Sequence, residues 1–142
     1  MDDGFDTHGR GFGEQAADRF RLARTRDLLV LMIRAIREGF QVLRVLHRHI
    51  VPSRLKIFEW LPEPILVAYL RRLCKREAME IAVVGHANAA RDEAKHLVGE
   101  FMVMVRQTPV PTHAIDCLMP FLDPATPLMP DGSAQIPLRW WK

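Results

Sequence analysis

The densest group of chemically active side chains lies within residues 80–106 and contains an imidazole, an amide, a guanidinium and a carboxylate. These groups belong to His86, Asn88, Arg91 and Glu93. On a helix, residues three, four or seven apart share a face, so His86 and Glu93 fall on one side and Asn88 and Arg91 on the other. Together they could form a polar pocket that binds a small anion or organic acid.

The alternative is a solvated helix surface whose polar side chains pair with one another, for example Asn88 with Asp92. Exposed pairs of this kind contribute only about 0.3–0.5 kcal/mol each. The residue types alone favour this solvated surface, and the pocket stays open as a hypothesis.

A second pattern in the same stretch is typical of metal sites. The spacing Glu93-x-x-His96 matches the carboxylate–imidazole pair of di-iron helix bundles. Such a site needs a second Glu-x-x-His and two further carboxylates. Neither His47 nor His49 has a glutamate three residues before it. Chance spacing on a solvated face explains the pair better, so we predict no metal site and assign no catalytic residue.

The common nucleotide-binding and hydrolase motifs are absent from the sequence. It contains no G-x-G-x-x-G turn after a strand, no phosphate-binding P-loop and no G-x-S-x-G. Gly9, Gly11 and Gly13 approach the first pattern, but no strand pattern precedes them. We therefore expect that this chain binds no cofactor by itself and is not a self-sufficient nucleotide-dependent enzyme.

The composition is that of a soluble globular domain. The 142 residues are 49% hydrophobic and 26% charged, with a net charge of +3 and no concentrated basic stripe, so we expect no nucleic-acid partner. The longest apolar run, residues 28–33, is too short to span a membrane. Cys74 and Cys117 lack C-x-x-C spacing, which favours reduced thiols in the cytoplasm, although a disulfide between them stays open.

Helical periodicity with proline breaks predicts an all-α domain, because no run alternates at period two. The predicted helices span residues 25–49, 54–60, 65–75, 80–106 and 112–122. The first helix is amphipathic. Its polar stripe consists of Arg34, Arg37, Glu38, Gln41, Arg44 and Arg48.

We expect three segments along the chain. Residues 1–17 are rich in glycine and aspartate and are predicted to be disordered. Residues 18–123 form the helical domain, and residues 124–142 form a non-regular, proline-rich tail. The tail ends in Trp140 and Trp141, which we expect to clasp the core rather than to act as a stacking platform.

Two stretches carry a resemblance to a known family. They are the run Asn-Ala-Ala-Arg-Asp-Glu-Ala at residues 88–94 and, after an amphipathic stretch, Val-Pro-Thr-His-Ala-Ile-Asp at residues 110–116, followed by Leu118. Over residues 25–123 the chain resembles the C-terminal domain of the ketopantoate reductase (2-dehydropantoate 2-reductase) family. There an acidic residue on a long helix precedes a G-[IV]-P-[TV]-P turn and a closing helix. Here residues 109–112 supply that turn, with Thr108 where a glycine is usual.

The resemblance implies an all-helical fold similar to the C-terminal domain of 6-phosphogluconate dehydrogenase. In full-length relatives this domain packs against a Rossmann domain that binds NADPH, and ketopantoate is reduced in the cleft between the two. Glu93 stands at the position that resembles the family's acidic residue, which contacts substrate or cofactor.

The sequence also departs from the family. None of its lysines begins the family's pattern of a catalytic lysine followed by asparagines, and the family's serine would fall near Ile81. We therefore expect a stand-alone or truncated helical domain without reductase activity of its own. It would form a homodimer or dock a separately encoded Rossmann domain. The alternative is a small-acid-binding or protein-interaction module without a redox role.

Overall fold

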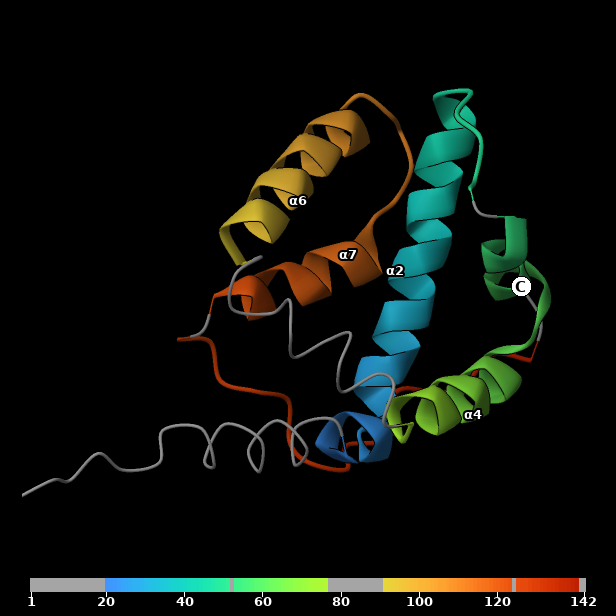
Figure 1. Ribbon diagram of the computed structural model, residues 1–142, viewed down its shortest axis with the longest axis vertical. Coiled ribbons are helices and arrows are strands. Elements are labelled where there is room, and N and C mark those ends of the chain that lie inside the picture. The colour runs from blue at the N-terminus through green and yellow to red at the C-terminus, as the bar shows by residue number, and fades with distance from the viewer. Residues whose placement is uncertain (1–19, 52, 77–90, 124, 141–142) are drawn as a thin grey trace, which may run out of the picture.

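The computed structural model describes residues 20–51, 53–76, 91–123 and 125–140 (Figure 1). Within these ranges the backbone forms helices, turns and irregular segments and no strand, which confirms the predicted all-α class. The predicted disordered segment, residues 1–17, lies outside the described residues. No described helix is both long enough and apolar enough to cross a membrane.

Helix α2, Arg26–Val45, is the element around which the described residues are arranged. It contacts α3, α4, α6 and α7. In Figure 1 it runs between α6 and α7 on one side and α4 on the other. The bounds of these neighbours are Ile57–Trp60 for α3, Glu63–Cys74 for α4, Arg91–Arg106 for α6 and His113–Leu118 for α7.

The ends of these helices follow from local backbone chemistry. Helix α2 begins after Thr25 as predicted, but it ends at Val45 rather than near His49, because His47 adopts a positive φ of 55°. Helix α4 begins at Glu63, two residues before the predicted start, because Pro64 lies in its first turn. A proline is accepted there since the first amides of a helix have no intrahelical partner.

Two predicted helices are each divided into an α-helical and a 3₁₀ part. The segment expected over residues 54–60 consists of η1, Ser53–Lys56, followed by α3. The segment expected over residues 112–122 consists of α7 followed by η2, Met119–Leu122. Of the long helix expected over residues 80–106, α6 forms the second half, and residues 80–90 lie outside the described residues.

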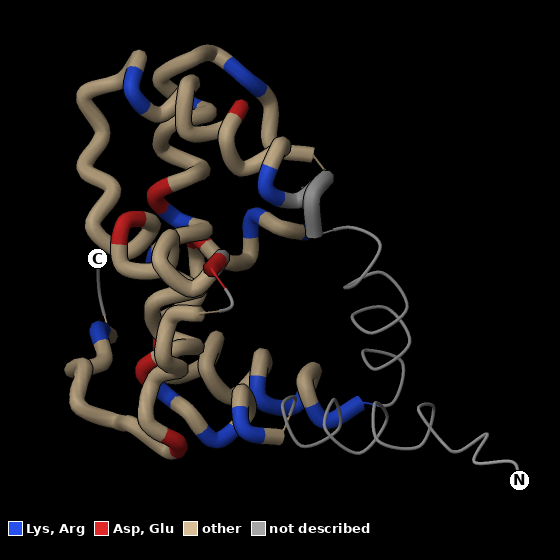
Figure 2. The backbone as a smooth tube through the Cα atoms, turned by 90° about the vertical axis from the view of Figure 1, so that its left-hand side faces the viewer, with Lys and Arg blue, Asp and Glu red and all other residues tan. Residues whose placement is uncertain are grey.

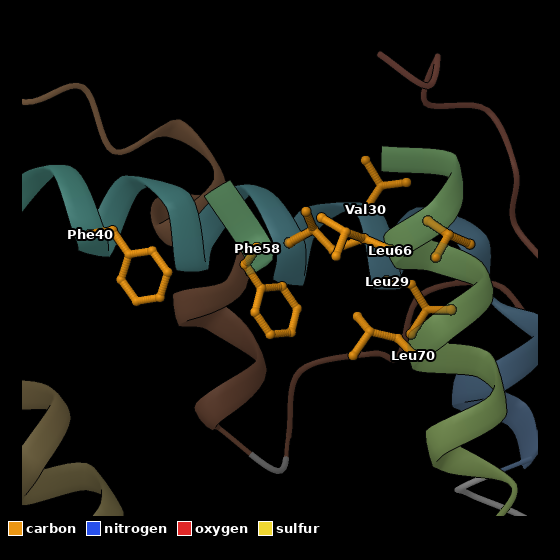
Figure 3. Close-up of a cluster of buried hydrophobic side chains, with 8 residues drawn as sticks. Leu29, Val30, Phe40, Phe58, Leu66 and Leu70 are labelled. Carbon is orange, nitrogen blue, oxygen red and sulfur yellow. The ribbon is translucent and has the colours of Figure 1, made fainter. Parts of the chain in front are cut away.

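The hydrophobic core lies where α3 and α4 pack against one side of α2 (Figure 3). Leu29 and Ile33 from α2 and Leu66 from α4 are fully buried. The other members of the cluster are Val30 and Phe40 from α2, Phe58 from α3, and Val67 and Leu70 from α4. This cluster fixes α4 against the N-terminal half of α2, and it therefore places the first turn of α4 beside the polar stripe of α2.

The C-terminal tail is non-regular, as predicted, and lies against the N-terminal ends of α2 and α4. Its residues Ile136 and Leu138 pack against the core cluster. Trp140 is 61% exposed, so the expected clasp by this tryptophan is wrong, and Trp141 lies outside the described residues. Two smaller aliphatic side chains make the contact instead.

Truncation of a core leucine tests this arrangement. We expect Leu66→Ala to lower the free energy of unfolding by about 2–5 kcal/mol, because a fully buried side chain is replaced by a cavity. The matched control is Leu97→Ala on α6, where the side chain is 57% exposed and the change should stay within about 0.5 kcal/mol. Urea denaturation followed by circular dichroism measures both, and equal losses would contradict the assigned core.

Candidate functional site

The side chains of the four predicted site residues all lie outside the part of the chain that the structure describes. His86 and Asn88 lie outside the described residues. Arg91 and Glu93 fall in the first turn of α6, where the backbone is described and the side chains are not. The polar pocket expected from these residues therefore stays a prediction.

The Glu93-x-x-His96 pattern has an ordinary explanation for its histidine. The Nε2 atom of His96 lies 3.3 Å from Oε1 of Glu100, and the two side chains are 75% and 64% exposed. Among the residues that the structure describes, no group of three His, Cys, Asp or Glu side chains could hold a metal ion. His96 thus belongs to a solvent-exposed pair on α6.

A cleft of about 580 Å³ opens elsewhere, on the polar stripe of α2. It is bounded by α2, α3, the start of α4, α7 and the C-terminal tail. Its lining residues are Leu31, Arg34, Arg37, Glu38, Gln41, Arg44, Glu59, Glu63, Pro111, His113, Ala114, Cys117, Ile136 and Arg139. We call it the arginine cleft.

The centre of this cleft is the carboxylate of Glu63, whose side chain is only 1% exposed. Arg34 donates to both of its oxygens, from Nε at 2.8 Å and from Nη2 at 3.0 Å. Nη1 of Arg37 lies 3.6 Å away, and the backbone amide of Arg139 donates to Oε2 at 2.8 Å. A fork of this kind is the strongest common hydrogen-bonding arrangement for a carboxylate.

Burial and charge act in opposite directions on these groups. Burial alone raises the pKa of Glu63, but the hydrogen bonds from Arg34 and Arg139 and the charges of Arg34 and Arg37 outweigh it, so the pKa lies below its ordinary value of 4.5. Burial lowers the pKa of the Arg37 guanidinium, the charge of Glu63 opposes this, and the like charges of Arg34 and Arg139 lower it further. Arg34 and Arg37 therefore share the field of one carboxylate, and the guanidinium of Arg139 adds a like charge that acts on Arg37.

Two of these arginines also hold the fold together. Arg37 donates from Nε to the carbonyl of Phe58 at 2.7 Å and from Nη2 to that of Leu61 at 2.6 Å. Arg34 donates from Nη2 to the carbonyl of Pro137 at 2.8 Å. Their guanidinium groups thus bind carbonyls at the C-terminal end of α3 and in the tail, where no intrahelical amide is available.

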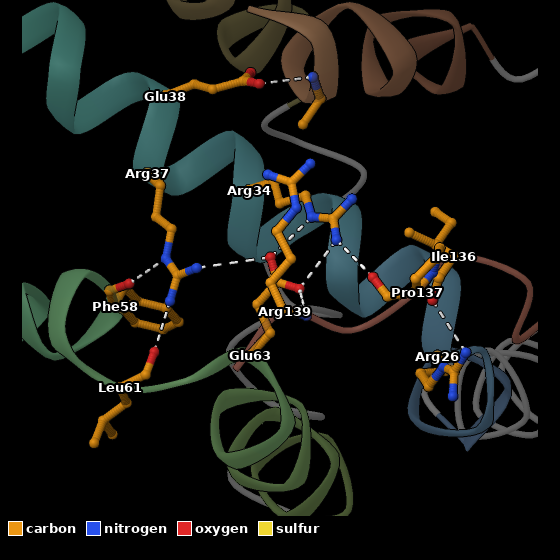
Figure 4. A network of polar contacts seen from close by, with 11 residues as sticks. Arg26, Arg34, Arg37, Glu38, Phe58, Leu61, Glu63, Ile136, Pro137 and Arg139 are labelled. Atoms are coloured by element: carbon orange, nitrogen blue, oxygen red, sulfur yellow. Dashed lines mark hydrogen bonds and ion pairs between the residues drawn. The ribbon is translucent and has the colours of Figure 1, made fainter. Parts of the chain in front are cut away.

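Arg139 differs from the other two. Its backbone amide and carbonyl both bond to Glu63, while its exposed guanidinium has no hydrogen bond or ion pair in the described part of the chain. Figure 4 shows the guanidinium groups of Arg34 and Arg37 in contact with the Glu63 carboxylate, and the side chain of Arg139 beside them with no interaction drawn to its guanidinium. This cluster holds three cations and one anion, and one of the cations is not used by the fold.

The outer part of the cleft is more nearly balanced in charge. Glu38 accepts hydrogen bonds from the amides of Ala114 and Ile115, each at 2.9 Å, and so caps α7. Thr112 occupies the N-cap position of α7 but makes no side-chain capping bond. The remaining charged pair is Arg44 with Glu59.

Over the whole cleft four arginines face three glutamates. Elsewhere in the described chain, lysine and arginine are spread from end to end with acidic residues among them (Figure 2). The uncompensated charge in the cleft is therefore local, and it comes from the placement of Arg139.

The sequence assigned the cleft residues of the first helix only to a polar stripe, and it gave Glu63 and Arg139 no functional role. The available signal was three arginines spaced three and seven residues apart, at positions 34, 37 and 44. Their pairing with Glu63 depends on how α4 crosses α2, and their proximity to Arg139 depends on the path of the tail. The periodicity of α2 predicts neither the crossing of the two helices nor the path of the tail.

Comparison with known proteins adds no relative. No family model, no characterised protein and no solved structure matches this chain.

Removing the central charge tests the site's electrostatics. We expect Glu63→Gln to lower the free energy of unfolding by about 3 kcal/mol, because Arg34 and Arg37 lose their shared counter-ion in a buried setting. The free energy of unfolding of the wild type should also depend on pH. Since the folded pKa of Glu63 is lowered, its contribution is complete above the unfolded pKa and falls as pH drops from about 5 through the folded pKa.

The acid-dependent part should be smaller in Glu63→Gln than in the wild type. The control is Glu100→Gln on α6, whose exposed pair with His96 should leave both the stability and its pH dependence unchanged within about 0.5 kcal/mol. Urea titrations between pH 7 and the acid limit provide the measurement. An unaltered acid profile in Glu63→Gln would contradict the assigned role.

Proposed function

We propose that this protein is a helical binding module for a small carboxylic acid, and that the ligand's carboxylate binds in the arginine cleft. The observation that supports this proposal is the surplus positive charge around Glu63, together with a guanidinium of Arg139 that has no partner in the described chain. This is the small-acid alternative expected from the sequence, at a different set of residues.

The chemistry favours a carboxylate at this position. A guanidinium presents its N–H donors in a planar fork that matches the two oxygens of a carboxylate, and both partners then make charge-assisted hydrogen bonds. A bound anion also relieves the repulsion between Arg139 and the buried Arg37. Apolar side chains of Leu31, Ala114 and Ile136 on the same cleft can cover the hydrocarbon part of an organic acid.

Arg139 contacts Glu63 only through its backbone, so its side chain is available to a ligand. The backbone of this residue docks the tail, with its amide 2.8 Å from Oε2 of Glu63 and its carbonyl 3.2 Å from the amide of Glu63. Replacement of the side chain therefore leaves the docking bonds in place. A loss of ligand binding in such a variant is separable from a loss of structure.

Isothermal titration calorimetry with pantoate, and with inorganic phosphate for comparison, tests this proposal. We expect saturable binding of pantoate that weakens by about 10- to 100-fold in Arg139→Gln, since a hydrogen bond to a charged group contributes about 1.5–3 kcal/mol. The matched control is Arg72→Gln, an exposed arginine on α4 that does not line the cleft. Equal affinity in wild type and Arg139→Gln, or no heat in either, would contradict the proposal.

The resemblance to ketopantoate reductase supports a second candidate, a C-terminal reductase domain that works only with a Rossmann partner. The observation in its favour is the non-helical segment at residues 109–112, which follows α6 and leads directly into α7 as the family pattern implies. In this candidate Glu93, with Asn88, Arg91 and His86, would contact the substrate.

A spectrophotometric assay addresses the second candidate. We expect no oxidation of NADPH when the protein is mixed with ketopantoate, because its sequence offers no dinucleotide-binding turn and no matching lysine. A full-length ketopantoate reductase serves as the positive control. Oxidation of NADPH by this chain alone would show that it carries a complete reductase site, and it would contradict the expected lack of activity.

A further inference from the structure

The segment at residues 129–139, which we call the tail segment, is held almost entirely by bonds to other elements. Its one internal backbone hydrogen bond joins the amide of Ser133 to the carbonyl of Pro130 at 3.0 Å. The rest of its hydrogen bonds run to side chains and backbone amides of α2 and α4, to Thr25 and to the helical turn at residues 20–24. In this respect it resembles a bound peptide more than a packed loop.

Two buried carboxylates bind the backbone amides of the tail segment. Asp27 accepts from the amides of Gln135 and Ile136, both at 2.8 Å, and from the hydroxyl of Ser133. Glu63 accepts from the amide of Arg139 at 2.8 Å. Carboxylates that are buried in this way require the donors of the tail segment, because an unpaired buried charge is costly.

Arginines bind the carbonyls of the same segment. Arg26 donates to the carbonyls of Ala134 and Ile136 at 2.6 and 3.0 Å, and Arg34 donates to that of Pro137 at 2.8 Å. We call the surface formed by Arg26, Asp27, Arg34 and Glu63 the tail-binding face. On this face the two carboxylates accept hydrogen bonds from amides of the tail segment, and the two arginines donate hydrogen bonds to its carbonyls.

The connection to the rest of the chain is short and exposed. Thr126 bonds to the carbonyls of Asp123 and Pro120 and so belongs to a turn on η2. Between this turn and the tail segment lie Pro127 and Leu128, which are exposed and make no hydrogen bond in the described part of the chain. A change in these two residues can redirect the tail segment without breaking any other contact.

We infer that the tail-binding face also accepts the tail segment of a second copy of this chain, giving a dimer with exchanged tails. Every hydrogen bond of the docked segment is the same whether the segment comes from its own chain or from the partner, so the two forms differ mainly in the tether. A short exposed hinge is the feature that permits such exchange.

Exchange would build each arginine cleft from two chains. Ile136 and Arg139 line the cleft and belong to the tail segment, whereas Arg34, Arg37 and Glu63 belong to the helices. The partner copy would therefore contribute the unpaired guanidinium of each site. The exchange itself does not rest on the proposed function, so the two can fail separately.

The connection through Pro127 and Leu128 sets the protein concentration at which the exchange of tail segments is measurable. A short flexible connection gives an effective concentration on the order of 1 mM for the segment of the same chain. At about 10 µM protein the exchanged form is then about one hundredth of the tethered form, and at about 1 mM the two are about equal. The exchanged fraction should rise about fiftyfold over this range.

Cross-linking between two differently labelled full-length chains tests the inference. Nη2 of Arg24 lies 2.8 Å from Oδ2 of Asp131, and both side chains are about half exposed. The contact joins the tips of two side chains, so cysteines at these positions are too far apart for a direct disulfide. A short bis-maleimide can join them when the tail segment is docked. In a Cys117→Ser background, one chain carries Arg24→Cys and the other Asp131→Cys. After equilibration under reducing conditions, removal of the reductant and addition of the bis-maleimide, mass spectrometry identifies the cross-link that joins residues 24 and 131.

The control pairs Asp131→Cys with Arg106→Cys, an exposed position at the end of α6. We expect the 24–131 heterodimer to exceed the 106–131 heterodimer by about tenfold at about 1 mM and to rise about fiftyfold from about 10 µM. Equal yields in the two pairs, or no heterodimer above the control, would overturn the inference. If a cysteine variant does not fold by circular dichroism, sedimentation velocity of the wild type over the same range decides, since a monomer throughout also overturns it.

Discussion

The bidentate bond between Arg34 and the buried carboxylate of Glu63 is the interaction on which the described structure most depends. It joins the middle of α2 to the first turn of α4, and the helix N-terminus adds a favourable field for the carboxylate. The same carboxylate then accepts the amide of Arg139, so one buried charge fixes two helices and the tail. Its burial is tolerated because each oxygen has a charged or backbone donor.

The cleft contains arginines that the fold needs and one arginine whose charge the fold does not use. The guanidinium groups of Arg34 and Arg37 contact the carboxylate of Glu63 and donate hydrogen bonds to carbonyls of Phe58, Leu61 and Pro137. Arg139 needs only its backbone to dock. Its guanidinium is added to a cleft whose other arginines, Arg34, Arg37 and Arg44, are matched by three glutamates, and it gives the cleft the positive character on which the proposed carboxylate binding depends.

The sequence predicted the described helices approximately because their signals are local, but it missed the early end of α2 and the 3₁₀ parts η1 and η2. Apolar residues recur at helical spacing in α2, and Thr25 and the prolines near residues 62 and 109 mark where helices begin or end. The cleft was not accessible in this way. Arg34 and Glu63 are 29 residues apart and Arg34 and Pro137 are 103 apart, and their meeting depends on how the helices cross and where the tail runs. The sequence favoured the polar residues of the long helix instead, because they are adjacent in the chain.

The most direct measurement of the central claim is nuclear magnetic resonance of the arginine side-chain Nε–Hε groups during titration with a small carboxylic acid. If the surplus charge of the cleft binds the ligand, the Arg139 resonance should shift saturably, and that of Arg24, which is paired with Asp131 outside the cleft, should not. Equal small shifts in all arginines, or an unmoved Arg139 resonance, would contradict the account.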